Sequence, residues 1–352
     1  MQIVYVKTKK EIKQFKKFRK DLYNNDPYYV STIEFTCDML LKKETLFAKS
    51  CDILPIMVKE HDKILAECIL VYNPKDDFIQ IAFFEALENV TNAVNCLKEE
   101  AFKFCKAKNL NRIIVGLNGH LSYGVGLSVD IKEPNTFDST YTKLYYLDYF
   151  KDGNIYDLAA FSSNIKDVIP SLKVKDSNIT IRPINLKHFK EEMEIFRDIC
   201  NETIGKTFLY SKTDKYHFEE LMSSMTFFLK NENILFAEDK GKVVGFIFWH
   251  PDYNEILRKG KQNSLLAIAV RYIFNKHKIK KVKLNAIGVK ENYQGNVTLM
   301  LLKETSKYIE KYQTIETNFV WENNKKSMLI NKRLLKNVER HFKVVEYIYD
   351  RD

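Results

Sequence analysis

One polar loop of the sequence has the composition and position to hold a phosphate group. It belongs to the segment VKLNAIGVKENYQGNVTLMLLKETSKYIEKY, from Val282 to Tyr312, in which an apolar strand precedes the loop KENYQGN and a long amphipathic helix. A helix that starts near Val297 leaves its first backbone amides without carbonyl partners and directs the positive end of its dipole at the loop. An anion could be held there, although in many proteins the same geometry only turns the chain.

A second group of candidate residues follows an apolar strand in the sequence GFIFWHPDYNEIL. His250 and Asp252 could transfer a proton near neutral pH as catalytic residues, and Asn254 could orient a polar group of a substrate. The alternative is that HPDYN only forms a turn, in which proline fixes the backbone and the polar side chains bind local amides. Three aromatic residues could line a substrate pocket or belong to the hydrophobic core: Trp249, Phe208 and Tyr210.

The sequence lacks the residue spacing of three other kinds of catalytic site: a zinc protease, a serine hydrolase and a nucleotide hydrolase. His217 begins HFEEL rather than HExxH, Ser128 lies in GLSVD without the second glycine of a nucleophile elbow, and no GxxxxGK[ST] loop is present. The six cysteines include no CxxC pair and lie mostly in apolar stretches, which predicts reduced, buried thiols. We therefore expect neither disulfides nor a bound metal.

The composition predicts a globular protein with two domains. The chain has 352 residues, 45% of them hydrophobic, which is enough for two cores. No apolar run approaches the roughly 20 residues of a membrane-spanning helix, and MQIVYVKTKK lacks the order of a signal peptide, so we expect a cytoplasmic protein without a membrane partner. The net charge of +10 is spread along the chain. Because no basic patch is interleaved with exposed aromatic residues, we do not expect nucleic-acid binding, and a small anionic ligand suits the charge equally well.

The order of the predicted elements repeats after about 180 residues, which indicates two copies of one α/β (α+β) unit. A β-hairpin is predicted around the turn from Glu60 to Lys63 and again around the turn from Asp239 to Lys242. In each half a short strand and a helix precede the hairpin, and a strand, a helix and a strand follow it. We predict domains at residues 1–162 and 178–352, separated by the polar segment SSNIKDVIPSLKVKDSN.

These elements resemble those of the GNAT acyl-coenzyme A acyltransferase superfamily. The resemblance rests on IGVKENYQGNVTLMLLKE and VWENNKKSMLINKRLL, and the doubled layout is similar to that of a bacterial group of tandem GNAT-fold proteins. GFIFWHPDYNEIL is similar to a proline-aspartate-x-asparagine segment of that group, and LYNNDPYYV and GLNGHLSYGVG extend the likeness into the first half. The resemblance covers nearly the whole chain. It implies two GNAT-like domains, each with a mixed, mostly antiparallel twisted sheet flanked by helices.

The resemblance also implies acetyl-coenzyme A as the cofactor. In the family two neighbouring strands splay apart, the pantetheine arm lies in the gap as an added strand would, and amides of the loop and helix start hold the pyrophosphate. In this chain the strand would be residues 284–289 and the loop residues 290–297. The implied cofactor-binding residues are Ile287, Gly288, Val289, Gln294, Gly295, Asn296, Val297, Thr298 and Asn324.

Two departures from the family pattern bear on activity. The loop pattern Q/R-x-x-G-x-G/A places Val297 and Leu299 where glycine or alanine is usual, and this bulk would keep a phosphate from the amides. Asn331 stands where the family often has the tyrosine that protonates the leaving thiolate, and an amide cannot donate that proton. Tyr293 is another candidate for this role.

The first half has no such loop, and Glu85 and Glu88 would repel a pyrophosphate, so we interpret it as a non-catalytic copy. We expect its segment GLNGHLSYGVG to be a shaped loop that lines the cleft between the copies.

Two functions from different classes are consistent with the sequence. The first is an N-acyltransferase that moves an acetyl group from acetyl-coenzyme A to an amine, on a small molecule or a peptide, with its site in the C-terminal domain. The alternative is a catalytically silent GNAT-fold protein that binds a small molecule or acts as a scaffold. The sequence identifies neither the acceptor nor the oligomeric state.

Overall fold

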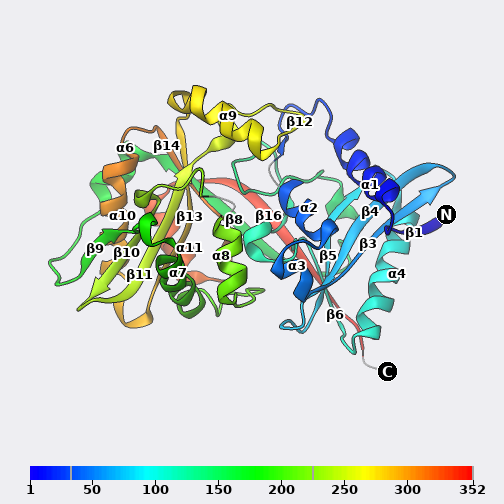
Figure 1. The fold of residues 1–352 in the computed structure, drawn as a ribbon, viewed down its shortest axis with the longest axis horizontal. Helices are drawn as coiled ribbons and strands as arrows, with labels where there is room; N and C mark the ends of the chain where they lie inside the picture. The colour runs from blue at the N-terminus through cyan, green and yellow to red at the C-terminus, as the bar shows by residue number, and fades with distance from the viewer. Residues whose placement is uncertain (32–33, 224–225, 351–352) are drawn as a thin grey trace.

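The protein is described by a computed structural model that covers residues 1–31, 34–223 and 226–350. One continuous sheet runs through both halves, with helices on its two faces (Figure 1). Its strand order is β1-β3-β4-β5-β6-β16-β8-β14-β13-β11-β10-β9, and the short strands β7 and β15 pair beside this path. Only β5 with β6 and β13 with β14 pair in parallel within this sheet, which confirms the predicted mixed, mostly antiparallel α/β fold.

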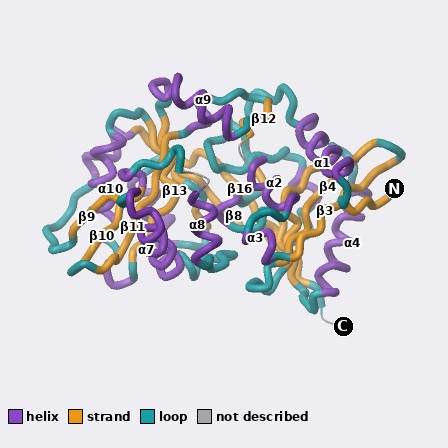
Figure 2. Tube along the Cα trace, in the orientation of Figure 1, coloured by secondary structure: helices purple, strands orange, loops and turns teal. Residues whose placement is uncertain are grey.

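The N-terminal half supplies five strands at one end of the sheet and four longer helices around them (Figure 2). Helix α4 covers one face with Ala93, Val94 and Leu97, and helices α1 to α3 cover the other face with Phe15, Leu40 and Phe47. The strands are β1 (Gln2–Tyr5), β3 (Asp52–Glu60), β4 (Lys63–Tyr72), β5 (Ile79–Ala86) and β6 (Arg112–Val115). The helices are α1 (Lys9–Leu22), α2 (Glu34–Lys42), α3 (Leu46–Ser50) and α4 (Thr91–Ala107).

The C-terminal half repeats this arrangement at the other end. Helix α10 packs on one face with Val297 and Leu301, and helices α7 and α8 pack on the other with Phe196 and Phe218. The strands are β9 (Thr180–Pro183), β10 (Ile234–Asp239), β11 (Lys242–Pro251), β13 (Lys281–Val289) and β14 (Thr314–Thr317). The helices are α7 (Phe189–Thr203), α8 (Lys215–Ser223), α9 (Leu265–Asn275), α10 (Asn296–Ile309) and α11 (Lys325–Leu334).

Both predicted hairpins are confirmed. Glu60 pairs with Lys63 at the turn between β3 and β4, and Asp239 pairs with Lys242 at the turn between β10 and β11. Shorter elements join the halves or lie between them: β2 (Val30–Ser31), which pairs in parallel with β12 (Lys261–Gln262), β7 (Leu127–Ser128), β15 (Val320–Trp321), α5 (Tyr146–Tyr149) and α6 (Ile165–Val168).

The two halves exchange their last strands. β8 (Asn154–Asn164) leaves the N-terminal half and pairs with β14, whereas β16 (Asn337–Ile348) returns from the C-terminal half and pairs with β6. β8 and β16 then pair with each other along most of their length. The predicted division at residues 162–178 remains a prediction about where one copy gives way to the next. It does not separate two independent sheets, because the strands on either side of the centre are exchanged.

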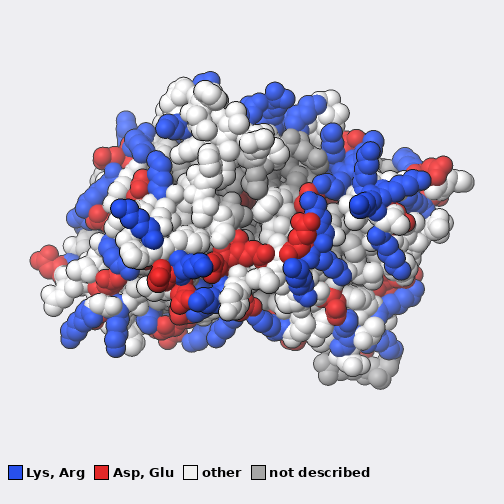
Figure 3. Space-filling model, viewed as in Figure 1, with Lys and Arg blue, Asp and Glu red and all other residues white. Residues whose placement is uncertain are grey.

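The side chains on the molecular surface agree with a dispersed positive charge. On the face shown in Figure 3, lysine and arginine side chains lie over both halves, with acidic side chains among them. All six cysteines are free and five are buried, as expected from the sequence, while Cys96 is partly exposed. Among the described residues, no helix combines the length and apolar character needed to cross a membrane.

A buried cluster of charges fastens a loop of the N-terminal half to the sheet of the C-terminal half. Glu316 is fully buried, and its carboxylate lies 3.2 Å from both Arg340 Nε and Lys281 Nζ. Thr136, from the N-terminal half, donates a hydrogen bond of 2.9 Å to the same carboxylate. Lys283 Nζ is also buried and donates to the hydroxyls of Thr136 and Ser139. Lys281 and Arg340 also pair with Glu133, whose side chain is 39% exposed, so Glu316 is the buried one of their two counter-charges.

We predict that Glu316→Gln lowers the free energy of unfolding by about 3 kcal/mol, because the two largely buried cations are then left with only the partly exposed Glu133 as a partner. Urea unfolding, followed by tryptophan fluorescence, measures this change. Glu322→Gln, at an exposed position, is the matched control and should change the stability by less than about 0.5 kcal/mol. Equal stability of the two variants would show that the cluster does not hold the halves together.

Candidate active site

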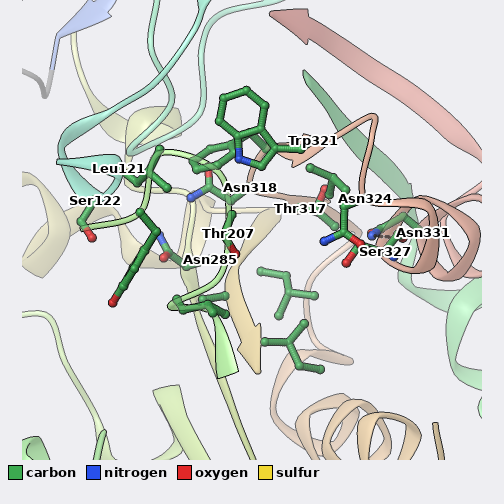
Figure 4. A pocket seen from close by; sticks show the side chains of 17 residues that line it. Leu121, Ser122, Thr207, Asn285, Thr317, Asn318, Trp321, Asn324, Ser327 and Asn331 are labelled. Carbon is green, nitrogen blue, oxygen red and sulfur yellow. Dashed lines mark hydrogen bonds between the residues drawn. The ribbon is translucent and has the colours of Figure 1, made fainter. Parts of the chain in front are cut away.

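A gap opens between β13 and β14 where their parallel pairing ends. The two strands pair only from Lys281 with Thr314 to Leu284 with Thr317, and the Asn318 amide adds a last hydrogen bond of 2.8 Å to the Leu284 carbonyl. Beyond this point β13 continues to Val289 beside β11 alone. The gap forms a cavity of about 220 Å³, shown with its lining side chains in Figure 4.

The backbone of β13 presents hydrogen-bonding groups to this gap. The Lys290 amide donates to the Val244 carbonyl on the β11 side. Because successive residues of a strand direct their backbone groups to opposite edges, those of Ile287 and Val289 face the gap instead. Gly288 between them has a packing role, since a Cβ atom there would lie 2.2 Å from the Thr203 hydroxyl of α7.

The loop after β13 ends at the free amino end of α10. Gly295 has a φ of +91°, and the Leu299 amide makes the first helical hydrogen bond to the Gly295 carbonyl. The amides of Asn296, Val297 and Thr298 have no hydrogen-bond partner among the described residues. The Gln294 side chain lies beside the loop, with its Nε2 3.4 Å from the Val289 carbonyl.

The expected crowding of this loop by Val297 does not occur. Its side chain is 4% exposed and packs into the core beneath α10, together with Leu301. Leu299 packs against the same core. Neither bulky residue therefore points at the open amides, and this observation removes the steric objection to an anion at that place.

The opposite wall of the gap comes from the segment after β14 and from α11. Asn324 caps α11 by accepting a hydrogen bond of 3.1 Å from the Ser327 amide, and Asn331 donates one of 2.8 Å to the Ser327 carbonyl. All three line the cavity on one side, as Figure 4 shows. Trp321 also lines it, and its indole Nε1 is buried without a hydrogen-bond partner among the described residues. This donor is left unsatisfied just behind the cavity wall.

A second cavity, of about 150 Å³, adjoins the first on the side of α7 and α8. The two share Leu121, Ser122, Tyr210 and Asn285 among their lining residues. The predicted cleft-lining role of GLNGHLSYGVG is thus matched by Leu121 and Ser122. The second cavity is walled mainly by aromatic and aliphatic side chains, and Asp138 is the one charged residue among its described lining residues.

The predicted catalytic residues lie behind this cavity rather than in its lining. His250 and Asp252 are 2% and 3% exposed. Asp252 accepts hydrogen bonds from the Phe137 amide at 2.8 Å and from the Asn254 amide at 3.1 Å. Burial raises the pKa of Asp252 to about 6. Asn254 donates to the Asn135 carbonyl at 2.7 Å, so this turn fastens the N-terminal half to β11.

Of the predicted substrate residues, Tyr210 lines both cavities, and burial raises its pKa. Trp249 lies in the core on the α10 side, where its Nε1 donates to the Glu232 carbonyl at 2.7 Å. Phe208 packs edge-on against Trp321 and so supports the wall of the first cavity from behind. Tyr293 donates to Asp239 at 2.8 Å and does not line either cavity.

The sequence reasoning missed several lining residues. Asn318 directly follows β14 and Trp321 lies in β15 just beyond it, and this position after the shorter strand of a splayed pair could have indicated both residues. Asp138 could not have been found from spacing, because it comes from a long loop of the other half. Its φ of +63° is unusual for a residue other than glycine.

The corresponding gap in the N-terminal half is filled by the protein itself. β5 and β6 pair from Ile79 to Ile81 only, as β13 and β14 do over a similar length. Beyond that point the Phe83 amide donates to Asn118 at 2.7 Å, and the Ala86 amide donates to the Tyr146 hydroxyl at 3.0 Å. Glu85 is buried and pairs with Arg19 at 2.9 Å. The cavity that remains measures only about 20 Å³.

We predict that Asp252→Asn increases the free energy of unfolding at pH 7.5 by about 1–3 kcal/mol. A carboxyl whose native pKa is raised binds more protons in the folded than in the unfolded state between pH 3.8 and about 6, so its charge costs stability above this window. The amide oxygen of asparagine can accept the same two backbone hydrogen bonds. Urea unfolding at pH 7.5 and 4.5 tests this, and the gain should shrink at pH 4.5. A variant that is less stable than the parent at pH 7.5 would contradict the prediction.

Comparisons with known proteins address the fold. Neither a protein-family model nor a curated protein matches the sequence. A tandem GNAT protein from the clavulanic acid biosynthesis pathway matches the structure over 100% of both chains, with a TM-score of 0.59 and 8% identity. A conserved protein of unknown function from Enterococcus faecalis V583, described as a probable N-acyltransferase, matches over 99% of this chain and 72% of its own, with a TM-score of 0.58 and 9% identity. A GCN5-related N-acetyltransferase from Anabaena variabilis ATCC 29413 matches over 99% of this chain and 73% of its own, with a TM-score of 0.54 and 8% identity. The chain therefore has the tandem GNAT fold.

Proposed function

We propose that the protein is an N-acyltransferase that moves an acetyl group from acetyl-coenzyme A to an amine, with its site in the C-terminal half. The observation that supports this most is the open gap between β13 and β14, into which Ile287 and Val289 direct their backbone groups. The N-terminal half fills the same gap with its own side chains. We therefore assign cofactor binding to the C-terminal copy and a supporting role to the N-terminal copy.

The residues of the C-terminal half fit this cofactor at both ends of its arm. The backbone groups of Ile287 and Val289 would bind the pantetheine amides as a neighbouring strand would. The free amides at the start of α10 would bind the pyrophosphate. Acetyl-coenzyme A supplies the acetyl group as a thioester. On this assignment Gln294, Gly295 and Asn324 border the cofactor, and Gly288 serves the packing of α7.

Acyl transfer to an amine requires two proton movements. A protonated amine must lose one proton before its nitrogen attacks the thioester carbonyl carbon, and it loses a second as the amide forms, while the departing sulfur gains one. His250 reaches the second cavity only through Asp138, whose carboxylate lies 3.4 Å from its Nε2. We assign the acceptance of the amine proton to this pair, and we assign Asp252 to positioning the loop that carries Asp138.

The sulfur needs a donor other than Asn331. Tyr210 is the one tyrosine among the described residues that line the two cavities, and its hydroxyl donates only a long hydrogen bond of 3.4 Å to Asn201. A phenol that is buried and weakly engaged can give its proton to a thiolate and regain one from the amine. We therefore assign the protonation of the leaving thiolate to Tyr210.

The second candidate is a silent GNAT-fold protein that binds a small molecule or acts as a scaffold. Asn331 favours it, because an amide occupies the wall position at which the family often has its tyrosine. The two candidates differ in whether the gap binds acetyl-coenzyme A and releases its thiol.

We predict that acetyl-coenzyme A binds with micromolar affinity and that Gly295→Trp weakens it by at least about tenfold, because an indole there would cover the amides at the start of α10. Isothermal titration calorimetry measures both affinities. Gly241→Trp is the matched control: both glycines have a positive φ and open space around the missing Cβ, but Gly241 lies in the turn between β10 and β11. Absence of heat with the parent protein at millimolar cofactor would favour the silent protein.

We predict that Tyr210→Phe lowers kcat by about 100-fold, which is the usual size of one general-acid contribution, and leaves the affinity for acetyl-coenzyme A unchanged. Thiol release with the best amine of a panel measures kcat, and calorimetry measures the affinity. Tyr216→Phe is the control, because Tyr216 lies on the neighbouring helix α8 and is 67% exposed. An unchanged kcat in Tyr210→Phe would exclude Tyr210 as the proton donor.

A further inference from the structure

The second cavity has the lining expected for an aromatic or aliphatic ligand. Phe196, Phe218 and Met222 come from α7 and α8, Phe248 comes from β11, and Phe137 comes from the N-terminal half. Its volume of about 150 Å³ is close to that of apolar protein cavities that bind a benzene ring. Ring faces also attract a cation placed over them.

One carboxylate interrupts this apolar lining. The Asp138 side chain is 30% exposed, and no described residue donates a hydrogen bond to its carboxylate. His250 Nε2 lies 3.4 Å from this carboxylate, and the fully buried Lys283 and Tyr253 are near enough to interact with it electrostatically. Lys283 Nζ donates its hydrogen bonds to the hydroxyls of Thr136 and Ser139 rather than to Asp138. The Asp138 carboxylate therefore lacks a hydrogen-bond donor among the described residues on the side that faces the cavity.

The hydrogen bonds of His250 determine which of its ring nitrogens faces Asp138. His250 Nδ1 lies 2.9 Å from the Pro251 carbonyl, which can only accept, so Nδ1 carries a proton. In a neutral imidazole Nε2 is then an unprotonated acceptor. Nε2 is buried without a hydrogen-bond partner and lies 3.4 Å from an Asp138 oxygen, which is also an acceptor. Two facing acceptors repel each other until one of them takes up a proton or a cation lies beside them.

We propose that this cavity takes the acceptor substrate, a primary amine carried on an aromatic or similarly apolar body, whose ammonium group lies against Asp138. That this amine is the acceptor of an acetyl group rests on the proposed function. Binding of the amine in the cavity does not require catalysis. The ammonium group donates hydrogen bonds to the Asp138 carboxylate, and the apolar body of the ligand packs against the aromatic walls of the cavity. One ammonium proton then passes to the Asp138–His250 pair, which relieves the repulsion between its facing acceptors and leaves the nitrogen lone pair free for attack.

Binding of 2-phenylethylamine tests this recognition without any cofactor. Two comparison ligands each lack one feature: 2-phenylethanol has the same ring without the charge, and ethanolamine has the charge without the ring. Calorimetry should find the aromatic amine at least about tenfold tighter than either. Asp138→Asn should remove that preference over the alcohol and should tolerate the left-handed backbone, as asparagine does. Asp148→Asn, at an exposed position on α5, is the matched control and should bind like the parent.

The outcomes separate this inference from the proposed function. If 2-phenylethylamine binds through Asp138 while acetyl-coenzyme A neither binds nor releases thiol, the recognition stands and the N-acyltransferase is wrong. If thiol release is fastest with ethanolamine or spermidine and is unaffected in Asp138→Asn, the enzyme stands and the aromatic acceptor is wrong. If octanoyl-coenzyme A binds much more tightly than acetyl-coenzyme A and excludes 2-phenylethylamine, the cavity holds an acyl chain, and the inference is overturned.

Discussion

The pairing of β8 with β16 is the constraint on which both cavities depend. Each of these strands belongs by sequence to one half and completes the sheet of the other, so their contact fixes the halves in one relative position. That position brings Leu121, Ser122 and Asp138 of the N-terminal half against α7, α8 and β13. The N-terminal copy thus contributes part of the lining of the site in the C-terminal half.

The two copies differ in how they satisfy the backbone where parallel strands part. A strand edge that loses its neighbour leaves amides and carbonyls that need partners. In the N-terminal half Asn118 and Tyr146 supply them, and the ion pair of Arg19 with Glu85 occupies the remaining space. In the C-terminal half no side chain within the described ranges bonds to the backbone of Ile287, so this edge is open to a ligand. One fold thereby yields a filled copy and an open copy through a few side chains.

The sequence was sufficient for the parts of the structure that local patterns determine. Alternation and turn residues indicated both hairpins, and the strand, loop and helix around Gly295 were recognised from the same patterns. The exchange of β8 and β16 was not visible, because nothing in either strand says which half it will complete. The orientation of Val297 was misjudged for a similar reason: a family pattern gives a residue type at a position, but the face of α10 decides whether its side chain points at the loop or at the core. Two interpretations of HPDYN were open from the sequence: that its histidine and aspartate transfer protons, or that the segment only forms a turn. The structure shows the turn, and it shows Asp138, a residue distant in sequence, between His250 and the cavity.

The exchanged strand also determines when this protein can become folded. β16 leaves the ribosome after every other strand of the sheet, yet it covers the edge of β6, which was made more than half a chain earlier. Until then, the edge of β6 remains uncovered and β8 lacks one of its neighbours. Pairing between strands so far apart in the sequence slows folding. Meanwhile the unpaired amides and carbonyls of the exposed strand edge can pair with another chain. The first copy can therefore complete its sheet only after the second copy has been translated.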